Sequence, residues 1–231
     1  DSIMEIAKRH KLFVIEDCAE AHGATYNEKK VGSIGDMGCF SFFGNKIVTT
    51  GEGGMITTDS GRYDEKGKVL RDHGMSKTEK YLHPHLGFNY RMTNLQAAIG
   101  VAQMERVEEI LKKRDEHAAQ YEEELQSVTG IGFQPKASWG RRVNWFFNIV
   151  VQKDFPLSRE ELLDKLKQEG VDARPCFKAI HQQPIYDAKE AFPVAERIAS
   201  SVVNLPCHPT LKKEDIHFIC ETIKKLGGSV E

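Results

Sequence analysis

The sequence has little net charge, no long apolar run and no cysteine framework. Its 231 residues carry 32 basic and 34 acidic side chains, a net charge of −2, which leaves no electrostatic footprint for nucleic acid or an anionic membrane. No apolar run approaches the length of a membrane span, and the first residues do not read as a secretory signal peptide. Repeats and low-complexity tracts are also absent from the sequence.

The cysteines argue against two further classes of protein. There are five of them, an odd number, and no two are spaced as Cys-x-x-Cys. A disulfide scaffold and a structural zinc site are therefore not expected. The pattern favours reduced thiols in a cytoplasmic protein.

One stretch combines β-leaning apolar runs with an isolated lysine. Residues 39–43 and 55–58 are largely apolar or β-branched, and the segment between them is rich in Gly, Thr and Asn around a single lysine, Lys46. An amine acts as a nucleophile only while it is uncharged, a state that close packing among small residues favours. The spacing alone leaves a second interpretation open, in which Lys46 is an ordinary solvated loop lysine.

A carboxylate follows an apolar run upstream of this lysine. Residues 12–15 predict a short buried parallel strand, and Asp17 stands at its C-terminal end, where open α/β sheets place ligand chemistry. A strand-end aspartate and an isolated lysine suggest pyridoxal phosphate (PLP). The lysine forms a Schiff base with the aldehyde, and the aspartate keeps the ring nitrogen protonated so that the ring withdraws electrons. Asp17 could instead cap a helix or a turn after the strand.

Two longer motifs carry a resemblance to a known family. Residues 41–55 read Ser-Phe-Phe-Gly-Asn-Lys-Ile-Val-Thr-Thr-Gly-Glu-Gly-Gly-Met, and residues 88–94 read Phe-Asn-Tyr-Arg-Met-Thr-Asn. With the rest of residues 15–58, they resemble the DegT/DnrJ/EryC1/StrS family of PLP-dependent sugar aminotransferases over nearly the whole chain. The resemblance implies an α/β protein of PLP fold type I (aspartate-aminotransferase-like). It also implies a homodimer with PLP as cofactor and pyridoxamine phosphate as its aminated form.

The resemblance also implies roles around the cofactor. Lys46 would hold PLP and then move a proton between the substrate carbon and C4′ of the cofactor. Asp17 would face the ring nitrogen, and Ser41 would bond the phosphate. Glu20 stands near the phenolic oxygen, where many relatives have Gln, so the protonation state of that contact is an open question. Asn89 would reach the phosphate of the neighbouring subunit, so that a complete site would need two chains.

Four further residues are weaker candidates for contacts with a sugar nucleotide. His22 could lie close to the cofactor, although a buried histidine with satisfied hydrogen bonds is the commoner case. Arg91 could bind a ligand or only shape the entry of the following helix. Arg174 has the charge and the forked donors for phosphate or carboxylate, and His181 lies in a loop. The remaining histidines have no Cys or carboxylate companions at ligand spacing, so no metal is expected.

The apolar periodicities predict the order of the elements. The first ten residues predict an amphipathic helix that would be the second half of a β-α-β crossover, and we expect the chain to be the C-terminal part of a longer enzyme. We expect residues 1–126 to be the remainder of the large PLP-binding domain and residues 127–231 to be a small α+β domain. Further helices are predicted over residues 61–72, 94–125, 158–170, 192–201 and 212–226, and further strands over 143–151, 171–177 and 202–205.

The residues and the resemblance together predict a nucleotide-sugar aminotransferase. Glutamate would donate its amine to PLP, and the pyridoxamine form would convert a 4-keto-6-deoxy nucleotide sugar to the 4-amino sugar. The alternatives are a 3-keto aminotransferase of the same family, a UDP or dTDP sugar as substrate, and a PLP-binding regulatory module without turnover. A related dehydratase is disfavoured because it lacks the Schiff-base lysine, which is present here as Lys46.

Overall fold

The computed structural model describes residues 1–186 and 190–228, which form two compact units. The first unit consists of residues 1–111 and 137–143, and the second of residues 112–136 and 144 onward. The two units are defined by which residues pack together, and residues 112–126 pack with the second unit. The domain boundary expected after residue 126 stays a prediction.

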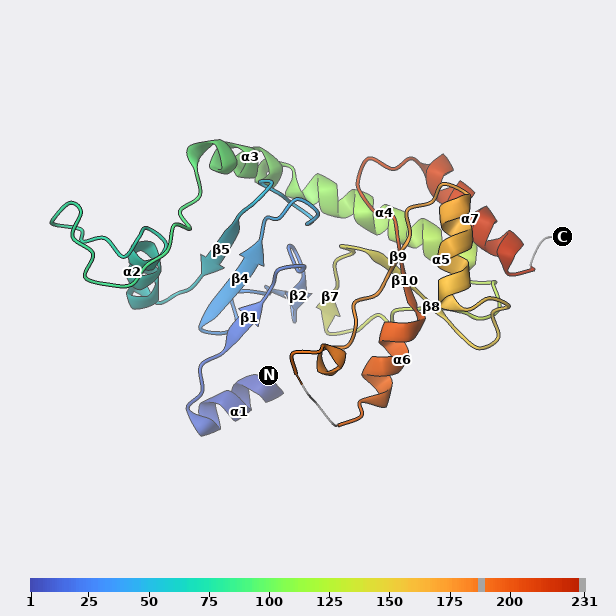
Figure 1. Ribbon diagram of the computed structural model, residues 1–231, viewed down its shortest axis with the longest axis horizontal. Coiled ribbons are helices and arrows are strands. Elements are labelled where there is room, and N and C mark those ends of the chain that lie inside the picture. The colour runs from blue at the N-terminus through green and yellow to red at the C-terminus, as the bar shows by residue number, and fades with distance from the viewer. Residues whose placement is uncertain (187–189, 229–231) are drawn as a thin grey trace. The chain divides into compact units, whose positions relative to one another are not determined.

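The first unit is built on a mixed three-stranded sheet in the order β1-β4-β5 (Figure 1). Strand β1 (Ile15–Asp17) runs parallel to β4 (Met37–Ser41), with Asp17 opposite Cys39, and β5 (Gly54–Thr57) is antiparallel to β4. A second small sheet has the order β3-β2-β7, from Lys29–Lys30, Thr25–Tyr26 and Gly140–Arg141. The helices of the unit are α1 (Ser2–His10), α2 (Gly61–Leu70) and α3 (Asn94–Glu105).

Two expectations for this unit are wrong in part. The strand after Leu12 is parallel, as predicted, but it is not buried: Ile15 is 63% exposed, because the described residues leave that face of the sheet uncovered. The helix expected over residues 94–125 is interrupted at Arg106, and α4 (Val107–Leu125) follows. The Arg106 N–H bonds to the carbonyl of Gln103, three residues back, which tightens the turn and breaks the α-helical ladder.

The second unit places helices against an antiparallel four-stranded sheet with the order β6-β8-β10-β9 (Figure 1). The strands are β6 (Ile131–Phe133), β8 (Phe147–Val151), β10 (Val202–Leu205) and β9 (Arg174–Pro175). The helical elements are most of α4, then α5 (Arg159–Gln168), the 3₁₀ turn η1 (Ile180–Gln182), α6 (Pro193–Ser201) and α7 (Lys213–Leu226). All four residues of β10 are buried, so this strand lies at the centre of the core.

Local sequence signals explain where several of these elements begin. Ser158 and Glu161 form the predicted capping box at the start of α5, which satisfies two of the backbone donors at that end. The strand predicted over residues 143–151 begins only at Phe147. The carbonyls of Asn144 and Trp145 accept hydrogen bonds from the buried Arg114 guanidinium, which binds them in place of a neighbouring strand.

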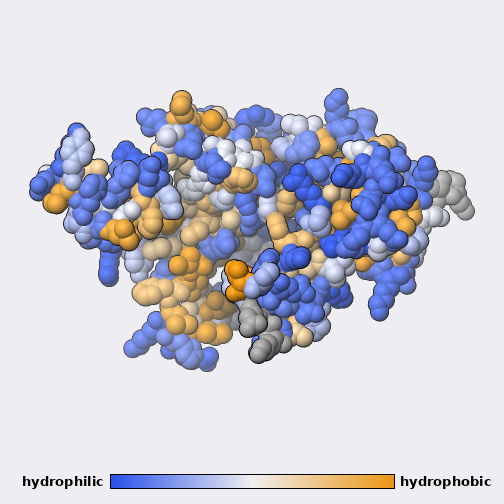
Figure 2. Space-filling model, in the orientation of Figure 1, coloured by the Kyte–Doolittle hydropathy of each residue, from blue (hydrophilic) through white to orange (hydrophobic). Residues whose placement is uncertain are grey.

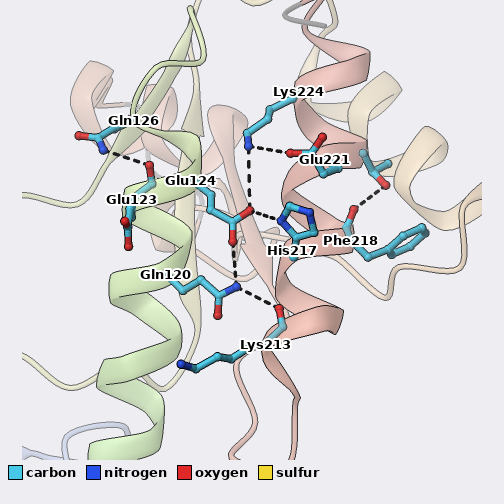
Figure 3. A network of polar contacts seen from close by, with 10 residues as sticks. Gln120, Glu123, Glu124, Gln126, Lys213, His217, Phe218, Glu221 and Lys224 are labelled. Carbon is cyan, nitrogen blue, oxygen red and sulfur yellow. Dashed lines mark hydrogen bonds and ion pairs between the residues drawn. The ribbon is translucent and has the colours of Figure 1, made fainter. Parts of the chain in front are cut away.

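A polar network joins α4 to α7 in the second unit (Figure 3). The Glu124 carboxylate accepts hydrogen bonds from Gln120 on its own helix and from His217 on α7, both at 2.8 Å. Lys224 lies 4.0 Å from the same carboxylate and 2.7 Å from Glu221. The two helices are therefore tied by charge as well as by apolar packing. No described helix is both long and apolar enough to cross a membrane.

Candidate active site around Lys46

The isolated lysine is paired with a carboxylate of the strand-end segment. Lys46 lies in the turn after β4, and its backbone N–H donates to the carbonyl of Phe43 at 3.0 Å. Its ammonium group forms an ion pair with Glu20, and its side chain is only 11% exposed. The solvated loop lysine is thus excluded, and two residues that are 26 positions apart in the sequence are brought together.

The loop that follows Lys46 is held by α3. Gln103 accepts a hydrogen bond from the backbone N–H of Thr49 at 3.3 Å, and Gln96 donates to the carbonyl of Glu52 at 3.1 Å. The two glutamines are seven residues apart and so lie on one face of the helix. Gly51, with φ at 80°, takes the left-handed conformation that the turn between these anchors requires.

Asp17 and Ser41 stand at the same edge of the sheet. Because β1 and β4 are parallel, their carboxyl ends meet at one side. Asp17 is exposed there, and one of its oxygens accepts the N–H of Ala19 at 3.2 Å. The Ser41 hydroxyl accepts the N–H of Phe43 at 3.3 Å. A carboxylate, a hydroxyl and the Lys46–Glu20 pair therefore follow the ends of two adjacent strands.

His22 is buried beside this pair, but it is not satisfied as expected. It is 5% exposed, and neither ring nitrogen has a hydrogen-bond partner among the described residues. Its ring lies 5.3 Å from the rings of both Phe40 and Phe42. Burial lowers the pKa of His22, and the Lys46 cation lowers it further, while Glu20 acts in the opposite direction. Burial and the Lys46 cation therefore both favour the neutral imidazole.

Sequence reasoning missed Glu16, a carboxylate in β1 that binds the turn before β4. Glu16 lies in β1 and accepts three backbone N–H groups, those of Gly32, Ile34 and Gly35, each at 2.7 Å. Burial opposes ionisation, but these three bonds hold the pKa of Glu16 below its ordinary value. The signal was the Gly-Ser-Ile-Gly turn at residues 32–35: the amides of Gly32, Ile34 and Gly35 belong to buried or half-buried residues and need an acceptor.

The other predicted residues have local partners. In the first unit, Asn89 forms an isolated bridge with Asp72, and the guanidinium of Arg91 pairs with the Asp72 carboxylate at 2.9 Å. In the second unit, Arg174 pairs with Asp172 at 2.9 Å and His181 with Glu196 at 3.0 Å. These contacts give each residue a structural role, and their ligand-binding roles stay predictions.

Comparison with known proteins gives the family. The model of the DegT/DnrJ/EryC1/StrS aminotransferase family matches residues 1–224. A GDP-perosamine synthase of Caulobacter vibrioides is 45% identical over 94% of the chain, and a UDP-N-acetyl-3-dehydro-α-D-glucosamine 3-aminotransferase of Acidithiobacillus ferrooxidans is 37% identical over 96%. The chain belongs to the DegT/DnrJ/EryC1/StrS aminotransferase family. It spans 59% of the length of each of these two relatives.

The structural comparison agrees. The aminotransferase PseC of Helicobacter pylori, which is involved in the biosynthesis of pseudoaminic acid, superposes with a TM-score of 0.92 at 28% identity, over 99% of this chain and 63% of PseC. The expected PLP fold type I is therefore confirmed. The family is PLP-dependent in general, and the residues around Lys46 fit that cofactor. A buried lysine can hold the aldehyde, an exposed strand-end carboxylate can face the ring nitrogen, and a hydroxyl at the same edge can bond the phosphate.

Proposed function

We propose that the chain acts in a PLP-dependent nucleotide-sugar aminotransferase. The observation that supports this most strongly is the Lys46–Glu20 ion pair beside the ends of β1 and β4. PLP, when bound, would supply the electron-withdrawing ring that makes transfer of an amino group possible. The protein would supply the attachment point, the orientation and the proton transfers.

Each residue has a defined part in this proposal. Lys46 holds the cofactor aldehyde and then carries the proton between the substrate carbon and C4′. Asp17 stabilises the protonated ring nitrogen, because an opposite charge at a buried ring favours its cationic form. Glu20 orients Lys46 and faces the phenolic oxygen, and Ser41 bonds the phosphate. Asn89 reaches the phosphate of a partner subunit in a homodimer.

The substrate we propose is a GDP-linked 4-keto-6-deoxy sugar, with glutamate as amino donor. The similarity to the Caulobacter GDP-perosamine synthase, at 45% identity, supports this choice over the 3-aminotransferase of UDP sugars, at 37%. The two substrates differ in nucleotide and in the carbon that is aminated. Parallel assays with glutamate and each keto sugar would separate them, and faster turnover of the UDP-linked 3-keto sugar would overturn the choice.

Attachment of the cofactor is tested by chemical trapping. Borohydride reduction of the PLP-loaded native protein should fix one cofactor per chain, and peptide mapping should find it on Lys46. Lys46→Arg keeps the positive charge near Glu20 but removes the primary amine, so it should lose both the covalent label and turnover. Labelling of a different lysine would contradict the proposed site.

The shared dimer site is tested by mixing subunits. If Asn89 acts across the interface, a heterodimer of Lys46→Ala and Asn89→Ala subunits has one site with both lesions and one with neither. Activity should then recover toward half of the wild-type value per heterodimer, although each parent is weak. If verified subunit exchange gives no recovery, Asn89 acts within its own chain or only in structure.

A further inference from the structure

Helix α3 contacts the loop after Lys46 at two positions on one of its faces. A Cβ atom on Gly100 would lie 3.0 Å from Cγ2 of Thr50, a closer approach than most Cβ atoms make, so the glycine lets the helix and the loop pack tightly. Toward the end of the helix, the Gln103 side chain accepts the Thr49 N–H at 3.3 Å. Positions three residues apart lie on the same face of a helix. The helix therefore both packs against this loop and binds its backbone.

The loop is closed on itself around Lys46. Phe42 stands at its start, and the Phe42 carbonyl accepts the Thr49 hydroxyl at 3.1 Å and the Thr50 N–H at 2.9 Å. Residues 47–48, which join Lys46 to Thr49, are buried. A segment that is tied at both ends and buried between them has little freedom to rearrange internally. Its remaining freedom is a shift of the whole loop, and the bond to α3 opposes that shift.

The bond from Thr49 to Gln103 also satisfies a backbone donor that needs an acceptor. Both residues are half-buried, so water competes with this bond only in part, and a buried N–H that loses its acceptor is costly. The hydroxyl of Thr49 is engaged elsewhere, because it donates to Phe42 and accepts the N–H of Gly51 at 2.9 Å. The Gln103 side chain is thus the acceptor that fixes the backbone of Thr49.

We propose that Gln103 is a positioning residue that holds Lys46 beside Glu20 by way of Thr49. With the bond in place, the loop keeps the Lys46 side chain 11% exposed and in its ion pair with Glu20. Without the bond, the loop shifts away from α3 more often and carries Lys46 with it, so the amine meets solvent. The use of this placement rests on the proposed aminotransferase, in which Lys46 must stay within reach of cofactor and substrate. The placement itself does not depend on that function.

Two substitutions separate the hydrogen bond from the shape of the side chain. Gln103→Met keeps the length but loses the strong acceptor, whereas Gln103→Glu keeps an oxygen that can accept the Thr49 N–H. In the cofactor-free native protein, hydrogen exchange of the Thr49 amide, followed by NMR, should be about three- to tenfold faster in Gln103→Met. Acetylation of Lys46 by an amine-reactive reagent, measured by peptide mass mapping, should rise by a similar factor. Gln103→Glu should stay close to the wild type in both measurements.

The results that would overturn the proposal are equally specific. Unchanged exchange at Thr49 in Gln103→Met would show that the bond does not hold the loop. Faster exchange with unchanged acetylation of Lys46 would show that the bond holds the loop without placing the amine. Gln126→Met is the control: it replaces an exposed glutamine that donates to the Glu123 carbonyl, and it should alter neither rate. Neither measurement needs PLP, so a failure of borohydride to label Lys46 would contradict the proposed function and leave this test valid.

Discussion

Glu16 shows how much one side chain contributes to the sheet that carries Lys46. Its carboxylate accepts hydrogen bonds from three backbone amides of the turn, those of Gly32, Ile34 and Gly35, and hydrogen bonds to a charged acceptor are about twice as strong as neutral ones. Glu16→Gln keeps the shape but turns an N–H₂ group toward backbone donors. We expect the free energy of unfolding to fall by about 1–3 kcal/mol at pH 7, measured by urea denaturation.

The pH dependence of this effect follows from the sign of the shift. The pKa of Glu16 is lowered in the folded protein, so its contribution is present above the unfolded value and is lost as the pH falls through the folded value. The difference between wild type and Glu16→Gln should therefore shrink in acid. A difference that stays constant from pH 7 to pH 3 would show that shape, not charge, is responsible.

The sequence predicted some of these residues and not others, for physical reasons. The positions of Lys46 and Asp17 could be predicted because each follows an apolar run. Residues that follow parallel strands meet at one edge of the sheet. Glu16 was not, because its partners are backbone amides that leave little trace in side-chain patterns. The unpartnered state of His22 was also out of reach, since burial can be read from a pattern but hydrogen bonding requires coordinates.

At the scale of elements, β4 packs closely against the turn at residues 32–35, whose amides bind Glu16. A Cβ atom on Gly38 would lie 2.5 Å from Cα of Gly32 and 2.6 Å from its carbonyl oxygen, and backbone cannot yield as a side chain can. Gly38→Ala should therefore destabilise the protein by more than 1 kcal/mol, seen as a lower melting temperature. Gly61→Ala, in α2 with open space around it, is the matched control and should be neutral or stabilising.

The α4–α7 network gives a second prediction at this scale. Burial opposes ionisation of Glu124, but hydrogen bonds from Gln120 and His217 and the charges of His217 and Lys224 hold its pKa below the ordinary value. Its side chain is 17% exposed, so water screens these contacts only in part. We expect Glu124→Gln to cost about 1 kcal/mol at pH 7, and to cost less as the pH falls through the folded pKa of Glu124.

Urea denaturation at several pH values checks this prediction against a neighbour. Glu221→Gln removes the other carboxylate near Lys224, but that side chain is 50% exposed, and exposed ion pairs contribute little. Its effect should be smaller than that of Glu124→Gln at neutral pH. Equal effects would mean that the ion pair with Lys224, and not the hydrogen bonds of Glu124, ties the two helices.

Element boundaries were predicted less well than element types, and the reason lies in contacts between distant residues. The helix interruption at Arg106 and the late start of β8 at Phe147 both depend on where carbonyl groups find donors. Apolar periodicity carries no information on such donors. The capping box at Ser158 was predictable because both of its partners lie within four residues.

At the scale of the whole molecule, several large apolar side chains of the first unit are exposed to solvent. Figure 2 shows hydrophobic residues gathered over the region of β1 and β4. The strand register puts Ile15, at 63% exposed, and Ile56, at 60%, on one face of the sheet, and Leu12 at 59% and Phe13 at 74% precede β1. Apolar patches of this kind, next to the open edges of short strands, favour association.

The 231-residue chain should therefore self-associate in a way that depends on its concentration. Sedimentation velocity should show a rising mean mass, and a dye that binds apolar surface should fluoresce. Ile56→Thr keeps a β-forming residue on β5 while it removes apolar surface, so it should reduce both signals. Phe218→Gln, on α7 of the second unit, removes an apolar residue that is 50% exposed, and it should change neither. Equal effects of the two variants would mean that association follows total apolar exposure and not this face.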